Sequence, residues 1–104
     1  IHQQTLRNRI SCSGVGLHGG VKVSLTLHPA APNTGIIFYR SDVAQGEPRI
    51  AASFKNVVES DLGTTVANAD GVKVSTIEHL MAALYGCGID NALIEVDGPE
   101  IPIM

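Results

Sequence analysis

Residues 21–28 alternate strictly between apolar and polar side chains, and this pattern restricts the fold more than any other feature of the sequence. A period of two places every second side chain on the same face of an extended chain. The segment is therefore predicted to be a half-buried β-strand. Its inward-facing residues are expected to be Val21, Val23, Leu25 and Leu27.

Shorter apolar segments elsewhere in the chain also favour strands. We expect these strands at residues 3–13, 35–40, 50–58, 64–68, 72–74 and 91–96. The dipeptide Asp70-Gly71 is typical of a tight hairpin turn, so the two strands that flank it are expected to pair. Residues 14–20 contain four glycines and are expected to form a loop.

Residues 75–85 are the one segment with clear helical periodicity. Ser75 is expected to cap this helix, and Glu78 three residues later would complete a capping box. Gly86 and Gly88 are expected to end it. Apolar residues at helical spacing form one stripe that consists of Ile77, Leu80, Met81 and Leu84.

The order of these elements, many strands followed by a helix and a further strand, indicates an α+β fold. We expect a two-layer α/β sandwich with a mostly antiparallel sheet and one clear helix. A single helix is too small to cover such a sheet, so a second helix is expected beyond Met104. The apolar last residues and a first residue other than Met favour a piece of a longer protein.

The length and charge of the chain argue against several classes of protein. A chain of 104 residues leaves room for one small domain. Its net charge of −3 offers no basic excess to neutralise phosphates, so nucleic acid is not expected as a partner. Its apolar runs are much shorter than the roughly 20 residues needed to cross a bilayer, so no transmembrane segment is expected.

The side of the predicted helix opposite its apolar stripe is unusual. His79 lies there with Ala82 and Ala83, and Glu78 lies at the edge of the stripe, whereas a solvent-facing side normally carries charges. We therefore expect this side to pack against or bind something. His79 as a metal ligand beside Glu78 as a general base would suit a zinc-bound water. A structural alternative stays open, in which the capping box accounts for Glu78 and His79 is a hydrogen-bonded surface residue.

Other polar residues give weaker signals. His18 in the glycine loop either contacts a phosphate or a substrate through backbone N–H groups, or it is a turn residue whose ring bonds a carbonyl. The second interpretation is favoured. Asp97 and Glu100 are assigned to a turn and to no function. The sequence contains no HExxH motif and no cysteine pair at metal-binding spacing, so spacing alone does not favour an enzyme.

Several blocks of sequence, taken together and in order, resemble a known family. These blocks are Thr5-Leu6, residues 14–18, residues 29–36, Leu62-Gly63-Thr64-Thr65, residues 74–84, Gly88-Ile89-Asp90-Asn91 and residues 99–104. They resemble the first part of the UDP-3-O-acyl-N-acetylglucosamine deacetylases. The resemblance extends over nearly the whole chain.

This resemblance implies a zinc-dependent amidase of lipid A biosynthesis in Gram-negative bacteria. Such an enzyme hydrolyses the N-acetyl group of UDP-3-O-(hydroxyacyl)-N-acetylglucosamine and releases acetate. The family implies two similar α/β domains of the ribosomal protein S5 domain 2-like type, of which residues 1–104 would be the first. It also implies a cytoplasmic enzyme, peripheral at the inner membrane through its lipid substrate. A His/His/Asp site of this kind suits Fe²⁺ as well as zinc.

Carried over residue by residue, the resemblance implies that His79 is a zinc ligand and that Glu78 is the general base. Leu62 and Gly63 match a loop beside the substrate, although Gly63 stands where some members have Cys. The remaining ligands come from the second domain in that family, so this chain alone is expected to be inactive. An alternative is a noncatalytic module that binds a sugar nucleotide or acts as a scaffold.

Overall fold

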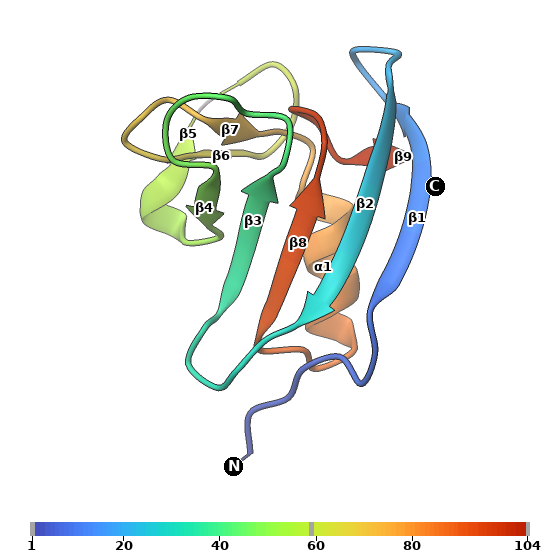
Figure 1. Cartoon of the computed structure of the whole chain (residues 1–104), viewed down its shortest axis with the longest axis vertical. Coiled ribbons are helices and arrows are strands. Elements are labelled where there is room, and N and C mark those ends of the chain that lie inside the picture. The colour runs from blue at the N-terminus through green and yellow to red at the C-terminus, as the bar shows by residue number, and fades with distance from the viewer. Residues whose placement is uncertain (1, 59, 104) are drawn as a thin grey trace.

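A computed structural model describes residues 2–58 and 60–103 of the chain. Its largest element is a six-stranded sheet, seen in Figure 1. In spatial order the strands are β4 (Arg49–Ala51), β3 (Ile36–Arg40), β8 (Ala92–Val96), β2 (Lys22–Pro29), β1 (Ile10–Gly16) and β9 (Pro102–Ile103). β3 and β8 run parallel, and the other neighbouring pairs are antiparallel. The prediction of a mostly antiparallel sheet is confirmed.

The alternating segment forms β2, which lies between β1 and β8. Val23, Leu25 and Leu27 are buried, as predicted. Val21 is 65% exposed, so its predicted inward orientation was wrong. The residue precedes β2 and lies in the turn, where its carbonyl accepts a hydrogen bond of 3.0 Å from the N–H of Gly16.

Other strand predictions need correction. The predicted strand at residues 3–13 begins only at Ile10 and continues to Gly16, because Gly14 and Val15 of the expected loop pair with β2 and Gly16 pairs with β9. The predicted strand at residues 50–58 is divided into β4, the 3-10 helix η1 (Phe54–Asn56) and β5 (Val57–Val58). β9 was not predicted, because it is short and contains a proline, which is rare inside sheets.

A second sheet of three strands consists of β5, β6 (Thr65–Ala67) and β7 (Lys73–Val74). β6 and β7 pair antiparallel with Val66 opposite Val74, so the predicted hairpin is confirmed. The turn between them is closed by the N–H of Asn68, which donates to the carbonyl of Val72 at 3.0 Å.

Helix α1 (Glu78–Gly86) begins three residues later than predicted. Its predicted apolar stripe is confirmed, because Ile77, Leu80 and Leu84 are all buried and Met81 packs against the same core. The predicted start was wrong. Residues 75–77 form the connection from β7, and Ile77 takes the N-cap position without a side-chain hydrogen bond.

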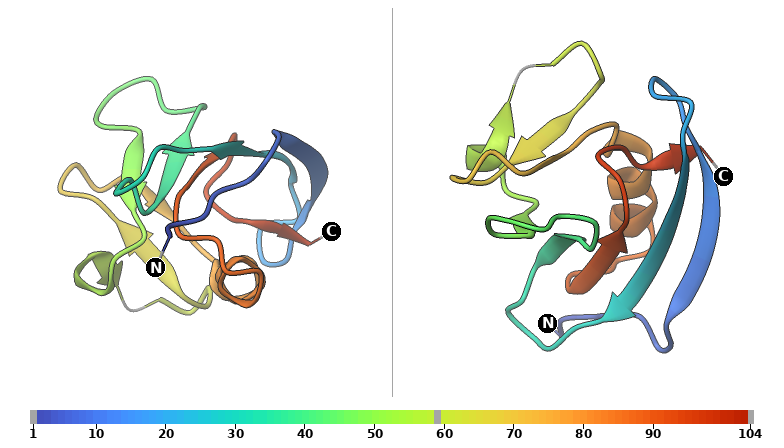
Figure 2. Two further views of the ribbon diagram at one scale, coloured as in Figure 1. Left: turned by 90° about the horizontal axis from the view of Figure 1, so that it is seen from below. Right: turned by 45° about the horizontal axis from the view of Figure 1, so that its top comes forward.

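The helix and the small sheet lie on the same side of the six-stranded sheet (Figures 1 and 2). The core between them is aliphatic apart from one aromatic ring, and its largest fully buried side chains are Phe38, Leu25, Ile50 and Ile94. This arrangement is the predicted two-layer α+β sandwich. No helix within residues 2–58 and 60–103 is long and apolar enough to span a membrane.

Candidate active site

Glu78 is the first residue of α1, and its carboxylate reaches the loop before β6. The backbone N–H of Thr64 donates to its Oε2 at 2.6 Å. The N–H of Ile77 donates in turn to the carbonyl of Thr64 at 3.2 Å. The start of the helix and the loop at residues 62–64 are therefore held together, and Glu78 is part of the link.

The predicted capping box does not form. Ser75 is buried and lies in a bridge with Glu100, where its N–H donates to the carbonyl of Pro99 at 2.8 Å. Its hydroxyl accepts a hydrogen bond of 2.9 Å from Thr65. Because these partners hold Ser75 away from the end of the helix, the structural explanation offered for Glu78 was wrong.

Gly63 lies beside Glu78, and the predicted place of Leu62 and Gly63 in a loop beside the substrate stays a prediction. Gly63 has φ +81°, and a Cβ atom there would lie 2.8 Å from Oε1 of Glu78. Gly63 and Glu78 line one open depression together with the exposed residues Val57 and Val58. The backbone of Gly63 therefore lies closer to the carboxylate than a residue with a Cβ atom could lie without a shift of Glu78.

His79 follows Glu78 directly but faces a different hollow. Its exposed ring lines a groove of about 400 Å³ whose other walls are mainly apolar. These walls are formed by Leu17, Thr76, Leu80, Ala83, Ile101 and Pro102. Ala82 and Ala83 are exposed on the same helix, and the expected packing or binding on this side stays a prediction. Glu78 and His79 thus lie next to each other at the start of α1 and line two different hollows.

The electrostatic surroundings of Glu78 favour its ionised form. The hydrogen bond from the Thr64 N–H lowers the pKa of the Glu78 carboxyl below its ordinary value, although partial burial acts in the opposite direction. The neighbouring His79 ring adds a smaller lowering of the same pKa. The carboxylate is therefore ionised at neutral pH, which is the state that can accept a proton.

Glu100, which was assigned to a turn without a function, is a central residue of this region. It is only 6% exposed, and its carboxylate accepts hydrogen bonds from the N–H groups of His18 and Gly19 at 3.0 and 3.1 Å. The hydroxyl of Thr76 lies 3.0 Å from the same group. The expected contact of the His18 ring with a carbonyl is replaced by an approach of 4.0 Å between its Nε2 and Glu100 Oε2.

A signal for Glu100 was present in the sequence. The residue stands among apolar neighbours at positions 99–103, where an acidic side chain must find hydrogen-bond donors if it is buried. The glycine loop offers such donors, because successive backbone N–H groups form concave sites for anions. That loop does bind an anion through its N–H groups, and the anion is a side chain of the same protein.

The donor set for a metal is incomplete within the described part of the chain. No group of three or more His, Cys, Asp or Glu residues there is arranged to hold an ion. His79 is of the right chemical type, since an exposed imidazole is a common zinc ligand. A catalytic zinc site takes three protein ligands, so two more would have to come from elsewhere.

Comparison with known proteins identifies the family. The model of the family described as "LpxC: UDP-3-O-acyl N-acetylglycosamine deacetylase" matches residues 3–104. The chain belongs to this family. The resemblance drawn from the sequence blocks is thereby confirmed.

Individual relatives are similar over the whole length of this chain. The UDP-3-O-acyl-N-acetylglucosamine deacetylase of Citrifermentans bemidjiense is 57% identical over 104 residues, which are 100% of this chain and 33% of that protein. Proteins of the same name from Geobacter sp. (strain M21) and Haemophilus influenzae (strain PittEE) are 56% and 54% identical, and this chain covers 33% and 34% of them. The chain thus spans about a third of the length of these curated relatives.

Proposed function

We propose that this chain provides the first part of a deacetylase that hydrolyses the N-acetyl group of UDP-3-O-acyl-N-acetylglucosamine in lipid A biosynthesis. The observation that carries the proposal is the placement of Glu78 and His79 at the start of α1. Glu78 is held by Thr64 rather than used in a helix cap, and His79 is exposed beside it. Membership of the family and the names of its relatives support the choice of substrate.

The reaction is the hydrolysis of an amide. Water adds to the acetamide carbonyl, the C–N bond of the resulting tetrahedral species breaks, and acetate and the free amine leave. Glu78 accepts the proton of the attacking water, because its carboxylate is ionised and one of its oxygens is oriented by the Thr64 N–H. The amine nitrogen receives a proton before it leaves, and the same carboxyl group can return the one it has taken.

His79 is the residue of this chain that would hold a catalytic zinc ion. Zinc, when bound, polarises the carbonyl and lowers the pKa of its bound water toward about 7. The two further ligands would come from the second domain, outside residues 1–104, and Fe²⁺ is an alternative metal for such a site. The groove beside His79 and the exposed alanines of α1 would then face that domain. An acylated substrate would bring this cytoplasmic enzyme to the surface of the inner membrane.

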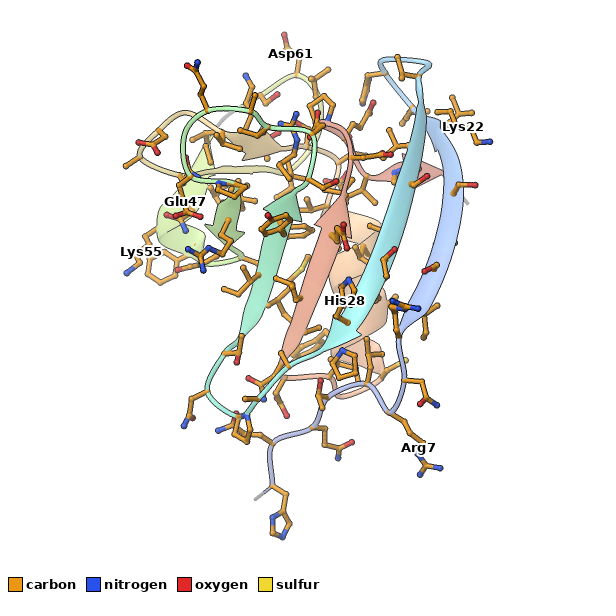
Figure 3. The ribbon with its side chains drawn as sticks, in the orientation of Figure 1. Arg7, Lys22, His28, Glu47, Lys55 and Asp61 are labelled. Atoms are coloured by element: carbon orange, nitrogen blue, oxygen red, sulfur yellow. The ribbon has the colours of Figure 1, made fainter. Side chains whose placement is uncertain are left out.

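The test uses the full-length protein and two histidine variants. His79→Ala is expected to remove both the bound zinc and the deacetylation of UDP-3-O-acyl-N-acetylglucosamine, measured as released acetate. His28→Ala is the matched control. Figure 3 shows His28 on β2, where its Nε2 lies 2.9 Å from Oε1 of Glu95, and the control should keep zinc and activity.

A second candidate function is a noncatalytic module that binds a sugar nucleotide or serves as a scaffold. It predicts that His79→Ala keeps whatever zinc and activity the wild-type protein has. If the full-length wild-type protein binds the substrate and releases no acetate, the module is the better explanation. The isolated chain is expected to be inactive under either function, because the deacetylase would lack two zinc ligands and the module catalyses no reaction.

A further inference from the structure

The buried carboxylate of Glu100 joins two segments that are distant in the sequence. The N–H groups of His18 and Gly19 donate to it from the loop between β1 and β2. The hydroxyl of Thr76 contacts it from the connection between β7 and α1. A carboxylate that is 6% exposed needs such partners to offset the loss of its hydration. The glycine loop is therefore tied to the residues that precede the helix.

Thr76 has an unusual backbone conformation at this junction. Its φ is +62°, in the left-handed region that β-branched residues rarely adopt. Such a conformation persists only where the surrounding contacts impose it, and it is often found at functional sites. The Oγ1 atom lies 3.0 Å from Glu100 Oε2 and 2.8 Å from the carbonyl oxygen of Leu62. The side chain is thus fixed between the buried carboxylate and the loop beside Glu78.

The bend at Thr76 sets the position of the groups assigned to catalysis. Ser75 continues the chain in a bridge with Glu100, whereas Glu78 already belongs to the helix. The bend therefore determines where α1 starts and in which direction Glu78 and His79 point. The contact of Thr76 with Leu62 also determines where the Thr64 N–H meets the carboxylate of Glu78.

We propose that Thr76 and Glu100 form a positioning pair for the deacetylase site. The Thr76 hydroxyl lies between Glu100 and the carbonyl oxygen of Leu62 and shares its one hydrogen between these two acceptors. This contact places the loop at residues 62–64, and the loop orients Glu78 through the Thr64 N–H. Both residues are buried, and in this proposal they act on the reaction through Glu78. The inference rests on the proposed function.

The chemistry of the contact suggests variants that distinguish the effect of the hydrogen bonds of Thr76 and Glu100 from the effect of their side-chain packing. A hydroxyl has one hydrogen, and Thr76 Oγ1 faces two acceptors, Leu62 O and Glu100 Oε2. In Glu100→Gln the amide oxygen can still accept from the loop N–H groups, and the amide NH₂ can donate to Thr76. Thr76→Ser keeps the hydroxyl, whereas Thr76→Val keeps the shape and removes it. Glu100→Ala removes every acceptor.

The experiment measures steady-state kinetics and amide hydrogen exchange of the full-length, zinc-loaded protein. Thr76→Val and Glu100→Ala are expected to lower kcat by on the order of 10- to 100-fold with KM near its wild-type value, because they misplace a catalytic group without removing it. Thr76→Ser and Glu100→Gln should remain close to the wild type. Glu95→Ala is the matched control, since Glu95 bonds His28 on the face of the large sheet opposite α1.

Hydrogen exchange tests the coupling without reference to activity. Glu100→Ala must accelerate exchange at His18 and Gly19, which lose their acceptor. The positioning pair also requires faster exchange at Thr64, which Glu100 does not contact, and the same acceleration at Thr64 in Thr76→Val. Acceleration confined to His18 and Gly19 would show a purely local role and would overturn the inference.

The remaining outcomes are also decisive. Activity of Thr76→Val and Glu100→Ala equal to that of the Glu95→Ala control would overturn the inference while leaving the proposed function intact. A wild-type protein that releases no acetate would instead contradict the proposed function. If Glu100→Ala does not fold, the comparison of Thr76→Val with Thr76→Ser decides by itself, because these variants differ in one hydroxyl and in their methyl groups.

Discussion

Glu78 and Glu100 are two carboxylates that the fold holds through similar contacts but exposes to different degrees. Each accepts hydrogen bonds from backbone N–H groups of a glycine-containing loop, Glu78 from Thr64 and Glu100 from His18 and Gly19. Each carboxylate also lies close to the backbone of a glycine. A Cβ atom at Gly63 would lie 2.8 Å from Glu78, and one at Gly16 would lie 2.5 Å from Glu100.

The difference lies in exposure and in the number of partners. Glu78 is half-buried, lines an open depression and has one strong donor from the loop. Glu100 is buried, and three donors from the loop and from Thr76 surround it. The same kind of loop contact thus leaves one carboxylate accessible and encloses the other. Only the accessible carboxylate of Glu78 can meet a water molecule or a substrate directly, whereas Glu100 can act on the site only through its neighbours.

The largest expected effect is on catalysis and concerns Glu78 alone. In the full-length protein, Glu78→Gln should reduce kcat by about 100- to 10,000-fold, because general-base catalysis contributes on that order. Its free energy of unfolding should change by about 1 kcal/mol or less, because the amide oxygen of Gln can still accept the hydrogen bond from the Thr64 N–H. Acetate release and urea denaturation measure the two quantities. A strongly destabilised Glu78→Gln protein would remove the distinction drawn between the two carboxylates.

The next largest effect is on stability and concerns the loop of Glu100. Gly16→Ala should lower the free energy of unfolding by about 1–3 kcal/mol, because the new methyl group overlaps a buried, hydrogen-bonded carboxylate. Gly86→Ala is the control. Gly86 is helical, and a Cβ atom there would point into open space among the described residues, so alanine should be neutral or stabilising. Equal stability of the two variants in urea would show that the Glu100 side chain can move aside at little cost in free energy.

The sequence draws attention to one of these carboxylates and not to the other. Glu78 stands in a helix with clear periodicity and within a block that resembles a family, and its catalytic role stays a prediction. The predicted capping box was wrong, because tertiary contacts place Ser75 in a bridge with Glu100 and give Thr76 a left-handed backbone conformation. The apolar neighbours of Glu100 indicate an acid that needs hydrogen-bond donors if it is buried, but its loop donors lie about eighty residues away in the chain. No local pattern shows which segment supplies them.

The same limit applies to the fold. Elements with a clear period were predicted well, as β2 and the stripe of α1 show. Errors occurred where long-range pairing decides the outcome. β1 extends into the glycine segment because β2 lies beside it, and Val21 is exposed because pairing between the two strands ends at Lys22. The alternation of apolar and polar residues continues through Val21, although the strand does not.

A smaller effect is expected at Gly63, where the cost of backbone strain can be distinguished from the effect of contact with Glu78. Gly63→Ala and Gly71→Ala place alanine at nearly equal φ values of +81° and +79°, which costs about 1–2 kcal/mol at either site. Only Gly63 has an atom of Glu78 in the way, because no described residue comes within 4 Å of a Cβ at Gly71. Stability should fall similarly in both variants, whereas kcat should fall only in Gly63→Ala. Equal kcat values for both variants would mean that the close contact between Gly63 and Glu78 does not matter for catalysis.

The smallest effect is a change in how stability depends on pH. Burial raises the pKa of the Glu100 carboxyl, but the N–H groups of Gly19 and His18 and the hydroxyl of Thr76 outweigh it, so the folded pKa lies below the ordinary value of 4.5. A group with a lowered folded pKa stabilises the protein above its unfolded pKa, and this contribution disappears as the pH falls through the folded value. The stability of the wild type relative to Glu100→Gln should therefore be constant from pH 7 to about 5 and decline below about 4.5. Urea denaturation of both proteins between pH 7 and 3 measures the difference, and a difference that stays constant over the whole range would show that the loop does not favour the ionised form of Glu100.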